Sequence, residues 1–130
     1  MFRFALWFVG LMALIAAPAL ADPLIGTWRT EPDRKNLTSL IRVVPCDGAL
    51  CGVVAKALGA AGRDVKTAHV GQTLFWGLRP KCGGTYDDGT VRVPMLNITA
   101  SARAELNGDR LRVTGCKGAL CDGQTWVPVR

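Results

Sequence analysis

The chain has 130 residues, a formal net charge of +6 at pH 7 and a hydrophobic fraction of 49%. This length is enough for one domain with one core, so we expect a single domain. The first 21 residues raise the hydrophobic fraction, so it does not indicate that the rest of the chain is a membrane protein.

The first 21 residues have the three-part layout of a secretory signal peptide. Arg3 is their only charge, an apolar run follows, and small residues lead to Ala21. The run contains Pro18 and is short for a bilayer span of about 20 residues. We therefore predict a signal peptide over 1–21 and one soluble domain over 22–130, periplasmic or secreted, with no transmembrane anchor after cleavage. The mature part would carry 15 basic and 10 acidic residues, a net charge of +5.

Beyond this leader, apolar and polar residues alternate with a period of two, which is typical of half-buried antiparallel strands. The alternating segments are, in chain order, 24–30, 38–45, 90–95, 98–106 and 110–115. The segment 73–78 is apolar on both faces, so either Phe75 or Trp76 is expected to face outward or toward a mouth.

Turn signals separate these segments. We expect short hairpin turns at Asp-Asp-Gly 87–89, at Asn-Gly-Asp 107–109, and within the two Gly-Ala-Leu segments that cysteines bracket. The long connection 59–72 is the only place where we expect a helical turn. About eight short strands predict an all-β fold, a closed or nearly closed antiparallel barrel, because closure removes exposed strand edges. A β-sandwich is the alternative.

All five cysteines lie beyond the predicted cleavage site, and an oxidising compartment favours disulfides. The motifs of zinc and haem sites do not fit their spacing, so we predict no metal and no cofactor. Local bridges Cys46–Cys51 and Cys116–Cys121 are the simplest pairing, each stabilising by about 2 kcal/mol. Pairing between the two brackets is the alternative and would stabilise more, since it closes a longer loop. Cys82 would be the free thiol.

Arginines recur on the outward-facing positions of the predicted strands. They are Arg29, Arg42, Arg92, Arg103, Arg110 and Arg112. A basic exterior can attract anionic lipid or glycan, or be a solvated face only. The exterior lacks the interleaved aromatic residues that stack on bases, which argues against a nucleic-acid partner.

Five short motifs occur in a fixed order: Gly26-Thr27-Trp28, Cys51-Gly52, Gly84-Thr85-Tyr86, Gly115-Cys116 and Gln124-Thr125-Trp126. Together they resemble the small exported bacterial proteins of the domain of unknown function 2147 family. The resemblance covers most of the mature chain and is weakest over 58–72. It implies a periplasmic protein with a lipocalin-like barrel and no assigned biochemistry.

The early Gly-x-Trp is also similar to the lipocalin signature. That resemblance implies that Trp28 plugs one end of the barrel and that a basic residue, Arg130 or Arg112, packs on its ring by a cation–π contact. The family tends to have a basic residue soon after its final Trp, whereas here Val127-Pro128-Val129 comes before Arg130.

No set of residues in the sequence suggests catalysis. The single histidine, His69, has no neighbouring nucleophile, and acidic residues are scattered. We therefore expect a non-enzymatic protein that binds a small apolar or amphipathic ligand inside the barrel. We predict Trp76, Tyr86 and Arg79 at the rim of such a pocket.

Two alternatives remain open at the level of the sequence. The interior could be solid, filled by Trp28, Phe75, Trp76 and Trp126. The protein could instead be a structural or interaction protein that contacts anionic envelope components, or a partner protein, through its arginine-rich exterior. The sequence carries no signal for the oligomeric state or the identity of a ligand.

Overall fold

The structure is a computed structural model that describes residues 10, 21–93 and 96–130. Apart from Gly10 and Ala21, the predicted signal peptide lies outside these residues. The strands are β1 (Gly26–Arg29), β2 (Thr38–Cys46), β3 (Ala49–Leu58), β4 (Asp64–Val65), β5 (Thr73–Pro80), β6 (Thr85–Val93), β7 (Ile98–Asn107), β8 (Arg110–Lys117) and β9 (Leu120–Pro128). The described ranges contain no α-helix, and so none long and apolar enough to span a membrane.

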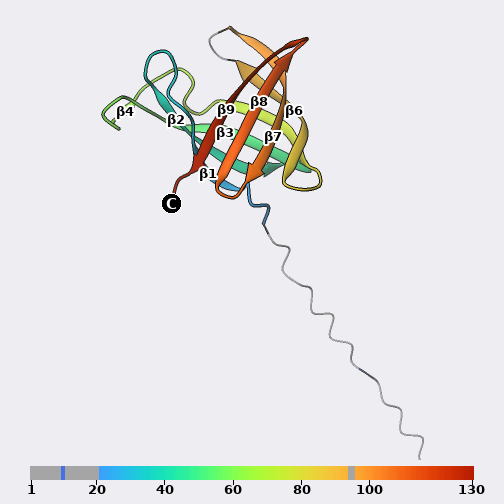
Figure 1. Cartoon of the computed structure of the whole chain (residues 1–130). Coiled ribbons are helices and arrows are strands. Elements are labelled where there is room, and N and C mark those ends of the chain that lie inside the picture. Colours follow the sequence, from blue (N-terminus) through green and yellow to red (C-terminus); the bar gives the residue numbers. More distant parts are fainter. Residues whose placement is uncertain (1–9, 11–20, 94–95) are drawn as a thin grey trace, which may run out of the picture.

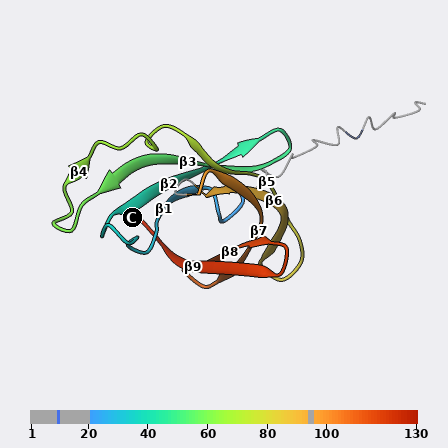
Figure 2. The same cartoon turned by 90° about the horizontal axis from the view of Figure 1, so that it is seen from above.

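Eight of the strands form a closed barrel (Figures 1 and 2). Their order is β2-β1-β9-β8-β7-β6-β5-β3, and β2 also pairs with β3, which closes the ring. Every pairing is antiparallel. β4 pairs only with the end of β3 and lies outside the ring. The predicted eight-stranded barrel is confirmed, and the β-sandwich is excluded.

The long connection 59–72 holds β4 and hydrogen-bonded turns, and the helical turn expected there is absent. Its end pairs with the neighbouring strand. The Gly71 N–H donates to the Val54 carbonyl at 2.7 Å, and the Val54 N–H donates to the Gln72 carbonyl at 2.9 Å. These backbone groups are bonded to β3 and are therefore not available for a helix.

The hairpin turn predicted at 87–89 is wrong, because β6 continues through it. Tyr86 pairs with Ala104 and Gly89 with Ala102, so one extra residue forms a β-bulge. Asp88 takes the left-handed conformation in the bulge, with φ 65°. A Cβ on Gly89 would lie 2.9 Å from Leu78 Cδ1 and 3.1 Å from the Ala102 carbonyl oxygen, so this position leaves little room for a side chain.

The β5–β6 turn lies at 81–84, closed by the Lys81 N–H donating to the Thr85 carbonyl at 2.8 Å. Lys81 also forms a 2.7 Å ion pair with Asp88, which joins this turn to the bulge. The hydrogen bond and positive charge of Lys81 lower the pKa of the Asp88 carboxyl below its usual value. The exposed thiol of Cys82 lies in the same turn. The turn predicted at 107–109 is confirmed, with Gly108 at φ 61° between β7 and β8.

Both local disulfides form, Cys46–Cys51 and Cys116–Cys121, and Cys82 is free. The two bridges have the same spacing but differ in register. Cys116 and Cys121 are direct cross-strand partners, whereas Cys46 lies opposite Ala49, so its bridge to Cys51 runs diagonally across the hairpin. The pairing between the two brackets, left open by the sequence, does not occur.

The difference in register follows from one residue. In the first hairpin, Asp47 and Gly48 both have positive φ, of 50° and 75°, which is typical of a type I′ turn. The second hairpin has Lys117 in place of Asp47, and lysine adopts positive φ far less readily than Asp or Asn. Its turn therefore begins one residue later, at Gly118, which has φ 60°.

The core fills the end of the barrel at which the segment before β1 enters, because Leu24 of that segment is one of its members. Its buried members come from every barrel strand and from the segment before β1. They are Leu24, Trp28, Ile41, Val43, Leu50, Val54, Phe75, Leu78, Tyr86, Ala104, Leu111 and Trp126. The other end of the barrel, at the β8–β9 hairpin and the β6–β7 connection, is not filled in this way.

Candidate ligand-binding mouth of the barrel

A cavity of about 440 Å³ opens at the end of the barrel that carries the β8–β9 hairpin. Inward-facing side chains of β5 to β8 form most of its apolar wall: Leu74, Val91, Val93, Ile98, Ala100 and Val113. We call this space the mouth cavity. Its existence shows that the interior is neither wholly solid nor wholly hollow, since the opposite half holds the core.

Small residues create the space. On the inner face of β7, Ala100, Ala102 and Ala104 follow one another, and Ala102 pairs with Gly115 of β8. A Cβ on Gly115 would lie 3.2 Å from Val91 Cγ1, so this part of the wall has no room for a larger residue on β8. Because the inward-facing side chains of β7 and β8 are small here, they leave space inside the barrel where the cavity begins.

Two aromatic rings of the core pack against each other next to the mouth cavity. Trp126 and Phe75 are 3% and 2% exposed, and their ring centroids lie 6.2 Å apart with a tilt of 40°. This separation is favourable for an aromatic pair. Because Trp126 also lines the cavity, its indole forms part of the cavity floor.

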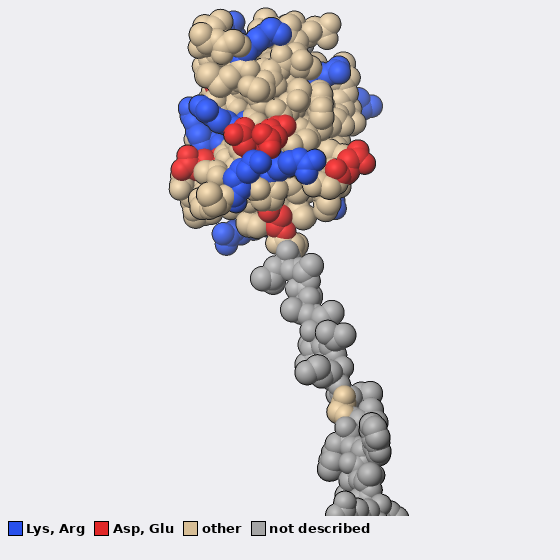
Figure 3. Space-filling view, turned by 90° about the vertical axis from the view of Figure 1, so that its right-hand side faces the viewer, with Lys and Arg blue, Asp and Glu red and all other residues tan. Residues whose placement is uncertain are grey.

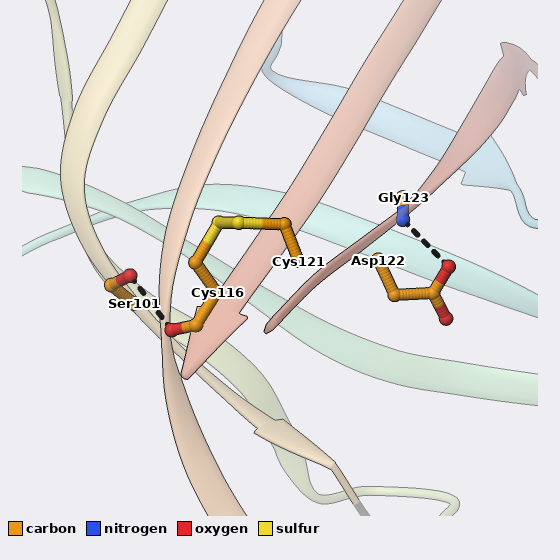
Figure 4. Close-up of a disulfide and its surroundings, with 5 residues drawn as sticks. All are labelled: Ser101, Cys116, Cys121, Asp122 and Gly123. Carbon is orange, nitrogen blue, oxygen red and sulfur yellow. Dashed lines mark hydrogen bonds between the residues drawn. A yellow bond between two sulfur atoms is a disulfide. The ribbon is translucent and has the colours of Figure 1, made fainter. Parts of the chain in front are cut away.

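Three polar side chains on the inner wall and rim belong to the two strands of the disulfide hairpin. Gln124 accepts a hydrogen bond from the Trp126 indole N–H at 3.1 Å. The Asp122 carboxylate accepts from the Gly123 N–H at 2.9 Å, and the ammonium of Lys117 donates to the Thr99 carbonyl at 3.3 Å (Figure 4 shows the hairpin). A few polar groups in an apolar wall are typical of a small-molecule site.

The rim of the mouth is apolar and exposed. Leu96 and Leu120 both line the cavity and are 66% and 81% exposed. Leu120 pairs with Lys117 and is on the same face of β9 as Gln124 and Trp126, so it is exposed because it lies at the open end of the barrel. In the first hairpin the corresponding residue, Leu50, is 5% exposed and belongs to the core.

The opposite end of the barrel is closed by the segment that precedes β1. Leu24 is fully buried, and its carbonyl accepts the Trp28 indole N–H at 2.9 Å. The Asp22 carboxylate accepts hydrogen bonds from the Leu24 N–H at 2.9 Å and from the Tyr86 hydroxyl at 2.8 Å. The segment 22–24 is therefore fixed to β6 at this end.

Trp28 is buried in the interior at this closed end, where the lipocalin resemblance puts a plug. The two candidate basic partners lie elsewhere. Arg112 is on the outer face, where its guanidinium donates to Thr125 Oγ1 at 3.4 Å, and Arg130 is exposed at the end of the chain. A cation–π contact to Trp28 from either residue stays a prediction.

The predicted rim residues do not line the mouth cavity. Tyr86 lies at the closed end, bonded to Asp22. Trp76 is half-buried on β5 next to the inward-facing Phe75, and exposed Arg79 donates to the Gly48 carbonyl at 3.3 Å. Whether these three contact a ligand stays a prediction. The alternation of apolar and polar residues could not predict which way these three side chains face, because bulges interrupt the pairing of β5 and β6.

Tyr86 provides a test of the closed end, because it is the only tyrosine in the chain. Burial, the hydrogen bond to Asp22 and the negative charge of Asp22 all raise the pKa of Tyr86 above 10. The unfolded chain therefore loses this proton first, and stability should fall as the pH rises above about 10. Absorbance at 295 nm should show Tyr86 still protonated at about pH 11 in the folded protein and mostly ionised in urea. Asp22→Asn should lower the folded-state pKa; equal pKa values in folded and unfolded protein would contradict the contact.

The outer surface carries both signs of charge. The face in Figure 3 shows basic and acidic side chains side by side. A shallow hollow of about 360 Å³ lies over β6 to β8, with Lys81, Arg103 and Arg112 next to Asp87 and Glu105. Within the described part of the chain, no three or more His, Cys, Asp or Glu side chains are grouped so that they could hold a metal ion.

An eight-stranded antiparallel barrel with a filled end and an apolar mouth belongs to the class of lipocalin-like barrels. Protein HP1028 from the human pathogen Helicobacter pylori, described as belonging to the lipocalin family, has a similar structure. The TM-score is 0.65, with 15% identity over 85% of each chain. At this identity the likeness concerns the fold alone.

The chain belongs to the family described as an uncharacterized protein conserved in bacteria (DUF2147), which matches residues 26–127. The resemblance drawn from the five ordered motifs is therefore confirmed. None of the curated proteins compared with the chain matches it.

Proposed function

We propose that this protein is a non-enzymatic binder of one small apolar or amphipathic ligand, which it holds in the mouth cavity. The observation that carries the proposal is the cavity itself, about 440 Å³, with apolar walls and a few polar groups. Small-molecule sites have volumes of roughly 300–1,000 Å³. The cavity has the volume of about 15 water molecules at about 30 Å³ each, so the ligand is small, such as a short-chain amphiphile or a single-ring compound.

The proposed location is the periplasm or the extracellular space. Two disulfides fit an oxidising compartment. The predicted leader over 1–21 would direct export, and cleavage after Ala21 would leave Asp22 at the N-terminus, where its carboxylate binds Tyr86. The ligand would then be one that is met in the bacterial envelope or outside the cell.

Native mass spectrometry of protein purified from its bacterial host tests the proposal. The wild-type protein should retain a small molecule. Ala100→Phe should lose it, because the ring would occupy the cavity that Ala100 lines. Thr99→Phe is the matched control, since it adds the same ring to the exposed face of the same strand and should keep the ligand. Absence of any retained mass in the wild type, or the same mass in Ala100→Phe, would contradict ligand binding here.

A second candidate function is contact with anionic envelope components or with a partner protein through the exterior. It is favoured by the exposure of all six arginines on outward strand positions. Binding to phosphatidylglycerol vesicles but not to phosphatidylcholine vesicles, with a steep loss at high salt, would support it. The neighbouring carboxylates in Figure 3 weaken the field of these arginines, which is why ligand binding is preferred.

A further inference from the structure

We infer that the mouth cavity selects apolar ligands that carry a carbonyl-type hydrogen-bond acceptor, and that the side-chain NH₂ group of Gln124 donates a hydrogen bond to this acceptor. The inference rests on the proposed function, that the cavity binds a small ligand. It names the chemical class of that ligand and the residue that determines it.

The first step is the orientation of the Gln124 carboxamide. Gln124 and Trp126 are two residues apart on β9 and share its inner face. The Trp126 indole N–H lies 3.1 Å from Gln124 Oε1. An indole can only donate, so the carboxamide must present its oxygen to Trp126, and its NH₂ group is on the other branch.

The second step is the availability of this NH₂ group. Among the described residues, no acceptor is hydrogen-bonded to the Gln124 NH₂ group. The group is also not a buried polar group without a partner, so it is accessible to solvent or to a ligand. Gln124 is half-buried and lines the cavity, so its two N–H groups can be satisfied from the cavity side by water or by a ligand. Replacing water there favours a ligand that can accept a hydrogen bond.

The third step is rigidity. Trp126 is 3% exposed and packed near Phe75, so the indole that holds the Gln124 oxygen is itself fixed. A donor held in one orientation by a buried partner loses little entropy when a ligand binds, and so contributes to discrimination. The surroundings of Gln124 are apolar. Val113 is its cross-strand partner on β8, and Val91 and Leu74 line the same cavity.

Charged residues at the rim of the cavity determine whether a neutral or an anionic acceptor is favoured. Asp122, the next inward residue on β9, is negative and disfavours a carboxylate, whereas Lys117 and Arg92 line the same cavity and favour one. Ketones, esters, amides and carboxylates share the carbonyl oxygen that Gln124 recognises. The experiment therefore includes a neutral and an anionic form of the same ligand.

The test compares acetophenone with ethylbenzene, which has a similar shape and no acceptor, and with benzoate. The key variant is Gln124→Glu, because a carboxylate still accepts the Trp126 N–H but donates nothing to the ligand. The ratio of the acetophenone affinity to the ethylbenzene affinity should fall about 3- to 10-fold in this variant, the effect of one lost hydrogen bond. The side-chain NH₂ protons of Gln124 should move further downfield with acetophenone or benzoate than with ethylbenzene, because only the first two accept a hydrogen bond.

Val113→Ala is the control variant, since it enlarges the cavity opposite Gln124 without changing any donor. It should alter both affinities together and leave their ratio unchanged. An unchanged ratio in Gln124→Glu, or a Gln124 NH₂ signal that does not respond to acetophenone, would overturn the inference while ligand binding in the cavity stands. If none of the three probes shifts the signals of the cavity wall, the proposed function fails as well.

Discussion

Gly52→Ala is expected to lower the free energy of unfolding by about 3 kcal/mol, at the upper end of the usual effect of overpacking a core. Gly52 of β3 lies opposite Phe75 of β5. A Cβ on Gly52 would lie 2.2 Å from Cε1 of the Phe75 ring, and the ring is only 2% exposed. It cannot move aside without displacing Trp126, the neighbouring aromatic side chain. Urea unfolding of the mature protein followed by circular dichroism measures the change.

Two further variants separate overpacking from the general effect of removing glycine. Gly123→Ala would place its Cβ 3.0 Å from the guanidinium of the exposed Arg112, which can move away, so its stability should stay within about 0.5 kcal/mol of wild type. Gly52→Ala combined with Phe75→Leu should be more stable than the sum of the single changes predicts, because the smaller side chain makes room for the methyl group. Additive effects in the double variant would contradict the proposed clash.

Leu24→Ala is expected to destabilise the mature protein by about 3 kcal/mol, the typical effect of truncating a fully buried leucine. Leu24 is 0% exposed although it lies only three residues after Ala21. Its loss would leave a cavity beside Trp28 at the closed end of the barrel, where the Leu24 carbonyl holds the indole N–H. Thermal unfolding should show a decrease in Tm of roughly 10–20 °C for a domain of this size.

Ile25→Ala is the matched control for Leu24→Ala, because Ile25 is the next residue and is 36% exposed. It should change stability by less than about 1 kcal/mol. If the two variants are equally stable, the segment 22–24 is not part of the core, and the closed end of the barrel would have to be formed in another way.

The barrel could be predicted from the sequence because its cause is local. Alternating side chains on β7 and β8 make half-buried strands, and Asn-Gly-Asp at 107–109 makes a tight turn. The spacing of the cysteines and the export that the leader predicts were likewise enough to propose both local disulfides, which the structure contains. What failed was the turn at 87–89, since Asp-Asp-Gly suits a bulge as well as a turn and only pairing with β7 distinguishes them.

The position and the lining of the mouth cavity could not be predicted, because they depend on which residues meet across the ring. Gln124 and Trp126 were visible as a motif, but their hydrogen bond and their position at the cavity floor require the closed barrel. Trp76, Tyr86 and Arg79 were chosen for a rim because they are aromatic or basic near strand ends. The structure places them on the outer face, at the closed end and beside the β2–β3 turn.

By itself the sequence determined the strand periodicity and the family, because these depend on neighbours within a few residues or on an ordered set of motifs, and the structure then decided the cysteine pairing. The tertiary structure decided whether each of two identical segments is buried or exposed. Gly-Ala-Leu-Cys occurs at 48–51 and at 118–121, yet Leu50 is 5% exposed in the core and Leu120 is 81% exposed at the mouth. The physical reason is that the two hairpins lie at opposite ends of the barrel. Leu50 pairs with Pro45 at the end that the core fills, and Leu120 pairs with Lys117 at the open mouth.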